Sequence, residues 1–387
     1  MLNRPRSFAI EFLLLSAIYC FPTGQAQVGE PKISDIKLEN FGWQALPTRQ
    51  IREWHSAPGS LVSIDSHGRV LVSFATRDNL SLATREKPGL TLHILRFTAD
   101  GKVDISLTLP TNDYFLNGIY LAANGQILAR ANGMLYLYQG DNETGNDGTA
   151  WRPLTSCPED CRISQSFGRR TLIVRTSAKP FSLENLTYKV FDLSSTPPEI
   201  RQTCSQMADY GERITDKFEY QYRVEAHTPH TRRFPFCNRD HAEELPLGWE
   251  ALVLPIDDEN FFSLGAEVKG SQGQVKLLGP DGQTKFLAKL PRHDTPLGYC
   301  GGAWATSANG GDRIAFMVST FRGGSNFFDI AAKLTGCRVV VYANDGRQIA
   351  SIPVGTKYQS DFDFALSPDG HRLAILESGL LTIADLK

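Results

Sequence analysis

The sequence has 387 residues, and its 40 basic and 42 acidic side chains leave a formal net charge of -2. It contains neither a basic stripe nor an acidic tail, which excludes the charge patterns typical of nucleic-acid-binding proteins and of cation buffers. Hydrophobic residues make up 41% of the chain, which is enough for a large core, so we expect a folded globular protein.

The first 26 residues predict a secretory signal peptide. Arg4 and Arg6 give a basic start, the run from Phe8 to Phe21 is largely apolar, and small residues precede Gln27 at the usual cleavage spacing. We therefore expect export to the periplasm or the extracellular space, with a mature chain that begins at Gln27.

Two alternatives for this segment are weaker. Glu11 interrupts the apolar run, which is also shorter than the about 20 residues that a helix needs to span a bilayer. Cys20 is a possible lipid attachment site, but the bulky Tyr19 stands where a small residue is expected. We expect no membrane span.

Six cysteines remain after cleavage, and an even number in an exported chain favours disulfides. Six cysteines allow about 15 pairings, so spacing alone leaves the connectivity open. Pairing neighbours along the chain joins Cys157 with Cys161, Cys204 with Cys237, and Cys300 with Cys337. The last pair is favoured because both of its cysteines fall in one repeat.

Residues 27–60 form an N-terminal segment in which only 33–38 alternates between apolar and polar side chains. From Leu61 to the end of the chain at residue 387, strand-length runs recur in pairs around tight turns. The turns lie at His67-Gly68, Asn124-Gly125, Phe167-Gly168, Asp257 to Asn260, Asn309 to Asp312, and Pro368-Asp369-Gly370. No segment has the periodicity of an amphipathic helix, so the chain is predicted to be all-β.

Four strands in a repeat of about 50 residues are typical of a β-propeller blade, which must pack against neighbours to bury its apolar faces. The last unit contains three strands and ends near Asp385. A three-stranded terminal blade leaves an open edge, so we predict that the strand near 33–38 adds to it and closes the ring.

Six units are readable, and residues 209–248 have the length of one more. That stretch contains an alternating strand from Phe218 to Val224 but no Asp-Gly turn. We predict a single domain of seven four-stranded blades over residues 61–387, with six blades as the alternative. In its hairpin pattern the chain resembles the WD-repeat and TolB-like propeller superfamilies. The resemblance lies in that pattern alone and carries no functional residue across.

Three histidines and a cysteine are the best candidates for metal ligands. His227 and His230 are three residues apart, and Cys237 and His241 follow. Nitrogen and sulfur ligands at such spacings are typical of zinc. An oxidised Cys237 would not bind zinc, and the surrounding charged residues suggest a surface loop. We therefore predict no metal or other cofactor, and keep the histidines as candidates only.

Asp361 and Asp363 are the carboxylate pair with a predicted position suited to a functional role. Residues two apart share a face of a strand, and this strand is predicted to be the innermost of its blade, so we expect both side chains to face the central channel. No Gly-x-Ser-x-Gly motif and no phosphate-binding glycine loop occurs in the sequence.

The sequence therefore favours an exported propeller that acts as a binding or scaffold module, with a protein, saccharide or small molecule as its ligand. The alternative is a hydrolase or lyase that acts on saccharide or peptide through loop residues, with or without a metal. No residue is assigned a catalytic role.

Overall fold

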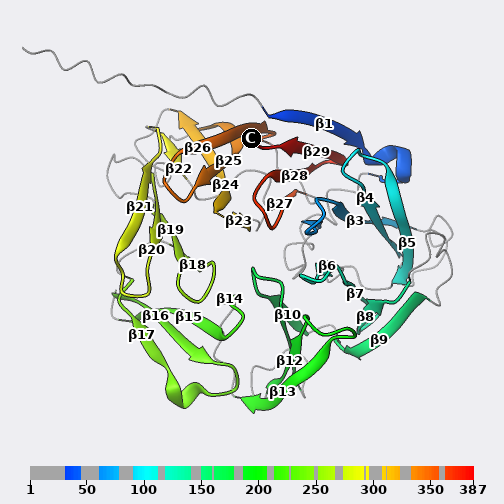
Figure 1. Ribbon diagram of the computed structural model, residues 1–387, viewed down its shortest axis with the longest axis horizontal. Coiled ribbons are helices and arrows are strands. Elements are labelled where there is room, and N and C mark those ends of the chain that lie inside the picture. Colours follow the sequence, from blue (N-terminus) through cyan, green and yellow to red (C-terminus); the bar gives the residue numbers. More distant parts are fainter. Residues whose placement is uncertain are drawn as a thin grey trace, which may run out of the picture.

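The computed structural model describes residues 31–44, 61–77, 90–111, 118–140, 150–158, 161–177, 186–206, 213–225, 228–247, 252–265, 273–291, 293–295, 307–310, 312–322, 333–356 and 362–387. They form seven antiparallel sheets arranged in a ring around a central axis (Figure 1). The protein is a seven-bladed β-propeller. The prediction of seven blades is confirmed, and the six-bladed alternative is wrong.

The first four blades follow the chain in order. Blade 1 contains β2 (Val62–Ile64), β3 (Val70–Arg77), β4 (Leu90–Phe97) and β5 (Val103–Thr111). Blade 2 contains β6 (Gly118–Leu121), β7 (Ile127–Ala131), β8 (Met134–Tyr138) and β9 (Trp151–Ser156). Blade 3 contains β10 (Arg162–Gln165), β11 (Thr171–Ser177), β12 (Leu186–Asp192) and β13 (Glu199–Gln206). Blade 4 contains β14 (Arg213–Ile214), β15 (Phe218–Glu225), β16 (Thr228–Pro235) and β17 (Glu243–Leu245), with the short helix η5 (Arg239–His241) before β17.

The remaining blades complete the ring. Blade 5 contains β18 (Leu252–Pro255), β19 (Phe261–Gly265), β20 (Gln274–Leu278) and β21 (Thr284–Lys289). Blade 6 contains β22 (Asp294–Thr295), β23 (Ser307–Gly310), β24 (Arg313–Arg322), β25 (Lys333–Ala343) and β26 (Gln348–Val354). Blade 7 contains β27 (Asp363–Leu366), β28 (Arg372–Glu377) and β29 (Leu380–Asp385), and β1 (Lys32–Lys37) is its fourth strand.

Side-chain alternation explains which strands lie at the rim and which lie inside. In the outer strand β5, buried Ile105, Leu107 and Leu109 alternate with exposed residues, as expected for a strand with one solvated face. The second strands β7 and β28 are buried along most of their length, because a neighbouring blade covers each of their faces.

Seven clusters of buried apolar residues hold the described part of the ring together, and each lies between two adjacent blades. The cluster between blades 6 and 7 contains Met317 and Val339 from one blade and Phe364 and Ile375 from the other. Each blade thus buries its two faces against its two neighbours.

The ring is closed by strand addition, as predicted. β1 pairs antiparallel with β29 over six residue pairs, from Lys32 with Asp385 to Lys37 with Leu380, and Figure 1 shows the two strands side by side. The short helix η1 (Leu38–Phe41) follows, and its Leu38 is fully buried between blades 7 and 1. The closing strand therefore supplies both backbone pairing and a core residue.

Blade 4 is the blade that the hairpin pattern shows least clearly, and it has the fewest apolar contacts among the described side chains. Its cluster with blade 3 contains six buried residues and its cluster with blade 5 contains five, against sixteen between blades 6 and 7. At about 25 cal/mol per Å² of buried apolar surface, smaller clusters contribute proportionally less. Other interactions also hold this blade in the ring.

Polar and covalent links supply those interactions. The Cys204–Cys237 disulfide joins blades 3 and 4 across 33 residues of sequence. Ser166 in blade 3 and Thr215 in blade 4 donate hydrogen bonds to Asp216 and Asp258 of the next blade. A disulfide that closes a loop of this length contributes about 4 kcal/mol by the chain-entropy relation.

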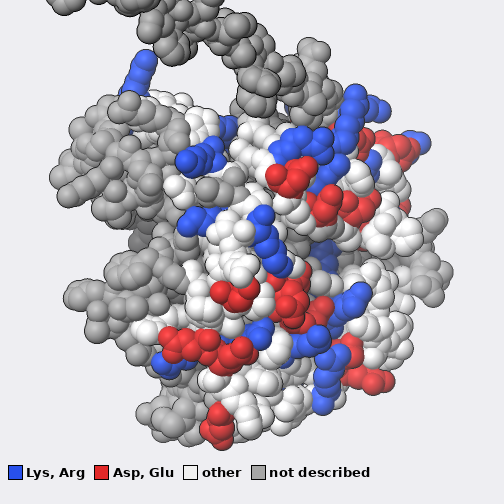
Figure 2. All heavy atoms as spheres, turned by 60° about the vertical axis from the view of Figure 1, so that its left-hand side comes forward, with Lys and Arg blue, Asp and Glu red and all other residues white. Residues whose placement is uncertain are grey.

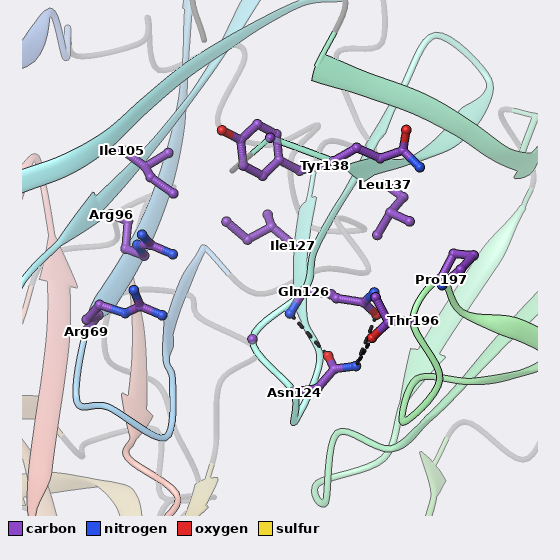
Figure 3. Close-up of a pocket in the computed structure, with 13 residues that line it drawn as sticks. Arg69, Arg96, Ile105, Asn124, Gln126, Ile127, Leu137, Tyr138, Thr196 and Pro197 are labelled. Carbon is purple, nitrogen blue, oxygen red and sulfur yellow. Dashed lines mark hydrogen bonds between the residues drawn. The ribbon is translucent and has the colours of Figure 1, made fainter. Parts of the chain in front are cut away.

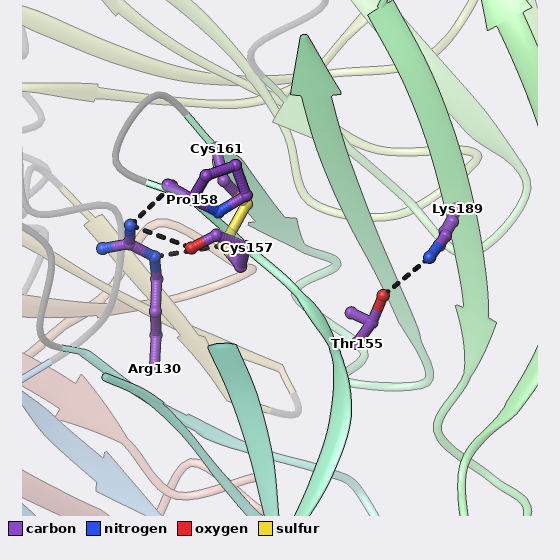
Figure 4. Close-up of a disulfide and its surroundings, with 6 residues drawn as sticks. All are labelled: Arg130, Thr155, Cys157, Pro158, Cys161 and Lys189. Carbon is purple, nitrogen blue, oxygen red and sulfur yellow. Dashed lines mark hydrogen bonds between the residues drawn. A yellow bond between two sulfur atoms is a disulfide. The ribbon is translucent and has the colours of Figure 1, made fainter. Parts of the chain in front are cut away.

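The Cys157–Cys161 disulfide closes a much shorter loop, of four residues, between blades 2 and 3. Arg130, which is fully buried, donates hydrogen bonds to the carbonyl oxygens of Cys157 at 3.2 Å and Pro158 at 2.7 Å (Figure 4). Nearby, Lys189 Nζ of blade 3 lies 2.8 Å from Thr155 Oγ1 of blade 2. Two of the three neighbour pairings are thus present. Cys337 is disulfide-bonded, and Cys300 lies outside the described residues.

Blade 6 differs from the sequence expectation in its inner strand. The pattern predicts one strand leading into the turn at Asn309, but the edge of β24 pairs with two separate pieces. β23 pairs with Arg313 to Phe316, and β22 pairs with Ser319 and Thr320. A strand as long as β24, with ten residues, offers more edge than one short inner strand can cover.

The predicted signal peptide lies outside the described residues, as does Cys20. In the part of the chain that is described, no helix is long and apolar enough to cross a membrane.

Candidate functional site

A cavity of about 660 Å³ opens at the end of blade 2, on the face that carries the turns between the first and second strands. Blade 1 forms one wall, and the turn between β12 and β13 of blade 3 forms the other (Figure 3). The lining residues are Arg69, Arg96, Ile105, Asn124, Gly125, Gln126, Ile127, Leu137, Tyr138, Gln139, Gly140, Thr196 and Pro197. The volume is within the roughly 300–1,000 Å³ typical of small-molecule sites.

Two arginines form the blade 1 wall, and acidic residues fix their orientation. Arg96 Nε lies 2.9 and 3.1 Å from the two carboxylate oxygens of Asp104, and its Nη2 lies 2.9 Å from one of them. Arg69 Nε lies 2.6 Å from Asp65 Oδ2, and its Nη1 lies 3.9 Å from Asp104 Oδ2. The two guanidinium groups therefore stand side by side at the cavity wall (Figure 3).

The turn between β2 and β3 explains why Arg69 is placed there. Asp65 Oδ1 accepts hydrogen bonds from the backbone N–H groups of His67 and Arg69, each at 2.9 Å, which is the usual way that Asp stabilises a turn. Gly68 has a φ of +73°, which glycine adopts without steric cost. The same Asp65 side chain thus shapes the turn and pairs with the guanidinium of Arg69.

The opposite wall belongs to blades 2 and 3. Asn124 Nδ2 contacts Thr196 Oγ1 at 3.3 Å and the Ser194 and Ser195 carbonyl oxygens at 3.5 Å each, and it also contacts Gln126 Oε1 at 3.2 Å. These contacts tie the β6–β7 turn to the β12–β13 turn, as Figure 3 shows for Asn124, Gln126 and Thr196. The wall is consequently polar and held in place from both blades.

The floor of the cavity is apolar. Ile105, Ile127 and Leu137 are all buried and belong to three different strands. The Tyr138 side chain lies over Gly140, where a Cβ atom would come within 2.4 Å of its hydroxyl oxygen. Residue 140 must therefore be glycine for Tyr138 to keep this position.

The lining combines hydrogen-bonding side chains with apolar ones. Among the described residues that line the cavity there is no Ser, His, Cys, Asp or Glu, and its side-chain hydroxyl groups come from Tyr138 and Thr196. Hydrogen-bond donors above an apolar floor are the usual arrangement of a ligand site.

The structure describes two of the three predicted histidines, His230 and His241. His230 Nδ1 contacts Glu244 Oε1, and this hydrogen bond holds the pKa of the Glu244 carboxyl below its usual value. His241 is exposed in η5, and His227 lies outside the described residues. Cys237 is bonded to Cys204 and so has no thiolate to offer. Nowhere among the residues described do three His, Cys, Asp or Glu side chains gather as metal ligands.

Asp363 lies at the start of the innermost strand of blade 7, and its carboxylate points at the backbone of blade 1. Its Oδ2 accepts hydrogen bonds from the N–H groups of Leu61 at 2.7 Å and Val62 at 3.0 Å, and its Oδ1 accepts one from Phe364 at 2.9 Å. Burial raises the pKa of Asp363 to about 6. This carboxylate links the last blade to the first, while Asp361 lies outside the described residues.

The cavity residues were not predicted from the sequence. Arg69, Arg96, Gln126 and Thr196 come from different hairpins of three blades, so no local motif connects them. The one available signal was Asp65, an acidic residue four positions before Arg69 in a predicted turn, but turns of this composition are common.

Charge is mixed on the side of the ring shown in Figure 2, where acidic and basic side chains intermingle over blades 4 to 6. The described part of that side shows no continuous basic surface, in keeping with the balanced composition.

Comparison with solved structures finds other propellers. The chain is similar to one in the crystal structure of the mitotic checkpoint complex, with 11% identity, full coverage of both chains and a TM-score of 0.48. It is also similar to TolB from Acinetobacter baumannii, with 17% identity, 76% of this chain and 65% of TolB covered, and a TM-score of 0.40. A third similar structure is the Dos1 propeller, with 10% identity, 86% and 93% coverage and a TM-score of 0.38. No family model matches the sequence, and no curated protein matches it.

Proposed function

We propose that the protein is an exported binding module whose ligand occupies the cavity at the end of blade 2. One observation carries this proposal: side chains from three blades surround a cavity of about 660 Å³ with polar walls and an apolar floor. Propellers present their binding residues on loops and turns held by a rigid ring, and this cavity is built from such turns.

The alternative of a hydrolase or lyase gains no support from the described residues. The described residues of the cavity lining include no carboxylate, and the buried Asp363 is occupied with backbone N–H groups of the neighbouring blade. A binding role does not require a free carboxylate at the cavity.

Thr196 offers a way to close the cavity from an exposed position, at the loss of its one side-chain contact with Asn124. We expect Thr196→Trp to abolish binding of any ligand found by native mass spectrometry of the mature protein against a mixed library of short peptides, oligosaccharides and organic acids. Thr108→Trp is the matched control, since Thr108 is exposed on β5 outside the cavity. A ligand that binds Thr196→Trp as tightly as the wild type would contradict the proposal.

Export is the second half of the proposal, and the disulfides support it, because disulfides form and persist in oxidising compartments. We infer a mature chain of residues 27–387, with the N-terminal segment 27–60 preceding the propeller at 61–387. After expression through a secretory pathway, we expect the intact mass to match cleavage before Gln27 with six hydrogens missing, from three disulfides. Retention of residues 1–26, or a fully reduced mass, would contradict export.

A further inference from the structure

The arginines of the cavity wall belong to a longer chain of alternating charges. Asp65 lies between Arg69, at 2.6 Å, and Arg169, whose electrostatic interaction with Asp65 favours the charged guanidinium. Arg169 comes from the β10–β11 turn of blade 3 and donates a hydrogen bond to the Ile64 carbonyl oxygen of blade 1. Asp104 then lies between Arg69 and Arg96. The order is Arg169, Asp65, Arg69, Asp104, Arg96.

This chain has one positive charge more than it has negative charges, because three guanidinium groups share two carboxylates. Desolvation lowers the pKa of Arg169 only to about 10, so its guanidinium keeps its charge at neutral pH. Two ion pairs in the surroundings are neutral: Lys102 pairs with Asp100 at 2.9 Å, and Arg372 pairs with Asp385 at 2.7 Å. The excess charge is therefore not balanced by these neighbours.

The excess positive charge is available to a ligand in the cavity. Within the part of the chain that is described, Arg69 Nη2 and Arg96 Nη1 make no hydrogen bond, although both side chains line the cavity. Their partners Asp65 and Asp104 do not line it. A ligand in the cavity thus meets two oriented guanidinium groups, with the acidic partners behind them.

We propose that the cavity binds a ligand through a single carboxylate carried on an apolar stem, with Arg69 and Arg96 as the recognising residues. Guanidinium groups held in a fixed orientation bind carboxylates through charge-assisted hydrogen bonds. One carboxylate balances the excess charge of the five-residue chain, whereas a phosphate dianion exceeds it. The stem contacts the apolar floor of Ile105, Ile127 and Leu137. This inference rests on the proposed function and specifies the chemistry of its ligand.

Two sources can supply this chemistry, a small organic acid or an acidic side chain in a peptide, and paired probes separate them. The small-acid arm compares octanoate with octanamide. The peptide arm compares N-acetyl-leucyl-glutamate amide with its glutamine analogue, and inorganic phosphate serves as a further probe. By isothermal titration calorimetry at fixed salt, we expect the acid of at least one arm to bind at least tenfold more tightly than its amide. The arm that responds identifies the source.

Arg69→Lys and Arg96→Lys test the recognising residues, since lysine keeps the charge but loses the planar fork. Each is expected to weaken binding of the carboxylate probe about tenfold or more, with an unchanged thermal midpoint as the check on folding. Lys102→Gln is the control: it removes one positive charge from an exposed side chain in the same blade that does not line the cavity, and binding should persist.

Four results would overturn the inference: amides that bind as well as acids, phosphate preferred at the same arginines, no binding of either acid, or equal loss in Lys102→Gln. Suppose that an uncharged probe binds the wild type and is excluded by Thr196→Trp. This result would overturn the inference that the ligand is recognised through a carboxylate, and it would leave the proposed function intact. Ligands insensitive to Thr196→Trp would overturn the proposed function itself.

Discussion

Glu219→Gln is expected to lower the free energy of unfolding by about 3–5 kcal/mol, because it removes the carboxylate charge from a buried ion pair with Arg175. Arg175 of blade 3 and Glu219 of blade 4 form an ion pair of 3.0 Å with side chains only 3% and 1% exposed. Chemical denaturation of the mature protein, followed by far-ultraviolet circular dichroism, measures the change.

A double-mutant cycle separates the ion pair from its surroundings. Arg175→Met and Glu219→Leu should each destabilise, and the double variant should recover most of the loss, because both charges leave the interior together. The control is Arg201→Met, which removes an exposed pair with Asp192 in blade 3 and should cost less than about 1 kcal/mol. Additive losses in the cycle would contradict a coupled pair.

The pair matters because of where it lies. Blade 4 has few apolar contacts on either side among the described side chains, and the ion pair lies between blades 3 and 4 together with the Cys204–Cys237 disulfide. We therefore expect Glu219→Gln to make blade 4 exchange its amide protons first, which hydrogen-exchange mass spectrometry resolves by blade.

Asp363→Ala is expected to destabilise the closed ring by about 2–5 kcal/mol, since it leaves the buried N–H groups of Leu61, Val62 and Phe364 without their acceptor. Asp363→Asn should also destabilise, because an amide offers one oxygen where the structure uses two. Thr382→Val is the control in the same blade: it removes an exposed hydrogen bond to Asp35 and should change stability by less than about 0.5 kcal/mol.

The loss should depend on pH in a defined direction. Burial raises the pKa of Asp363 from 3.8 to about 6, so the folded state binds this proton more tightly than the unfolded state does. The proton on Asp363 therefore adds on the order of 3 kcal/mol to the free energy of unfolding. This contribution is fully present below pH 3.8 and is lost as the pH rises through 6. The destabilisation by Asp363→Ala should therefore be larger at pH 4 than at pH 7. A loss that is constant between these values would show that the pKa is not raised.

Much of the fold could be predicted from the sequence because hairpins are local. Turns such as Asn124-Gly125 and Pro368-Asp369-Gly370 set the register of the strands that flank them, and an alternating segment at 33–38 was sufficient to predict the closing strand, observed as β1 at Lys32–Lys37. Blade 4 was predicted from its length and one alternating strand, Phe218 to Val224, without a recognisable turn, and its third strand carries the charged Arg232 and Arg233.

The site could not be predicted, because it depends on which blades become neighbours. Arg69 and Thr196 are 127 positions apart and belong to different hairpins, and only the curvature of the ring brings blades 1, 2 and 3 to one cavity. Asp363 illustrates the same limit: alternation along its strand suggested the channel, yet its partners Leu61 and Val62 are about 300 residues away. The sequence by itself determined the hairpins, the repeat and the closing strand, which depend on local turns and side-chain alternation. The tertiary structure alone decided which polar side chains meet, because contacts between blades join residues that no local pattern relates.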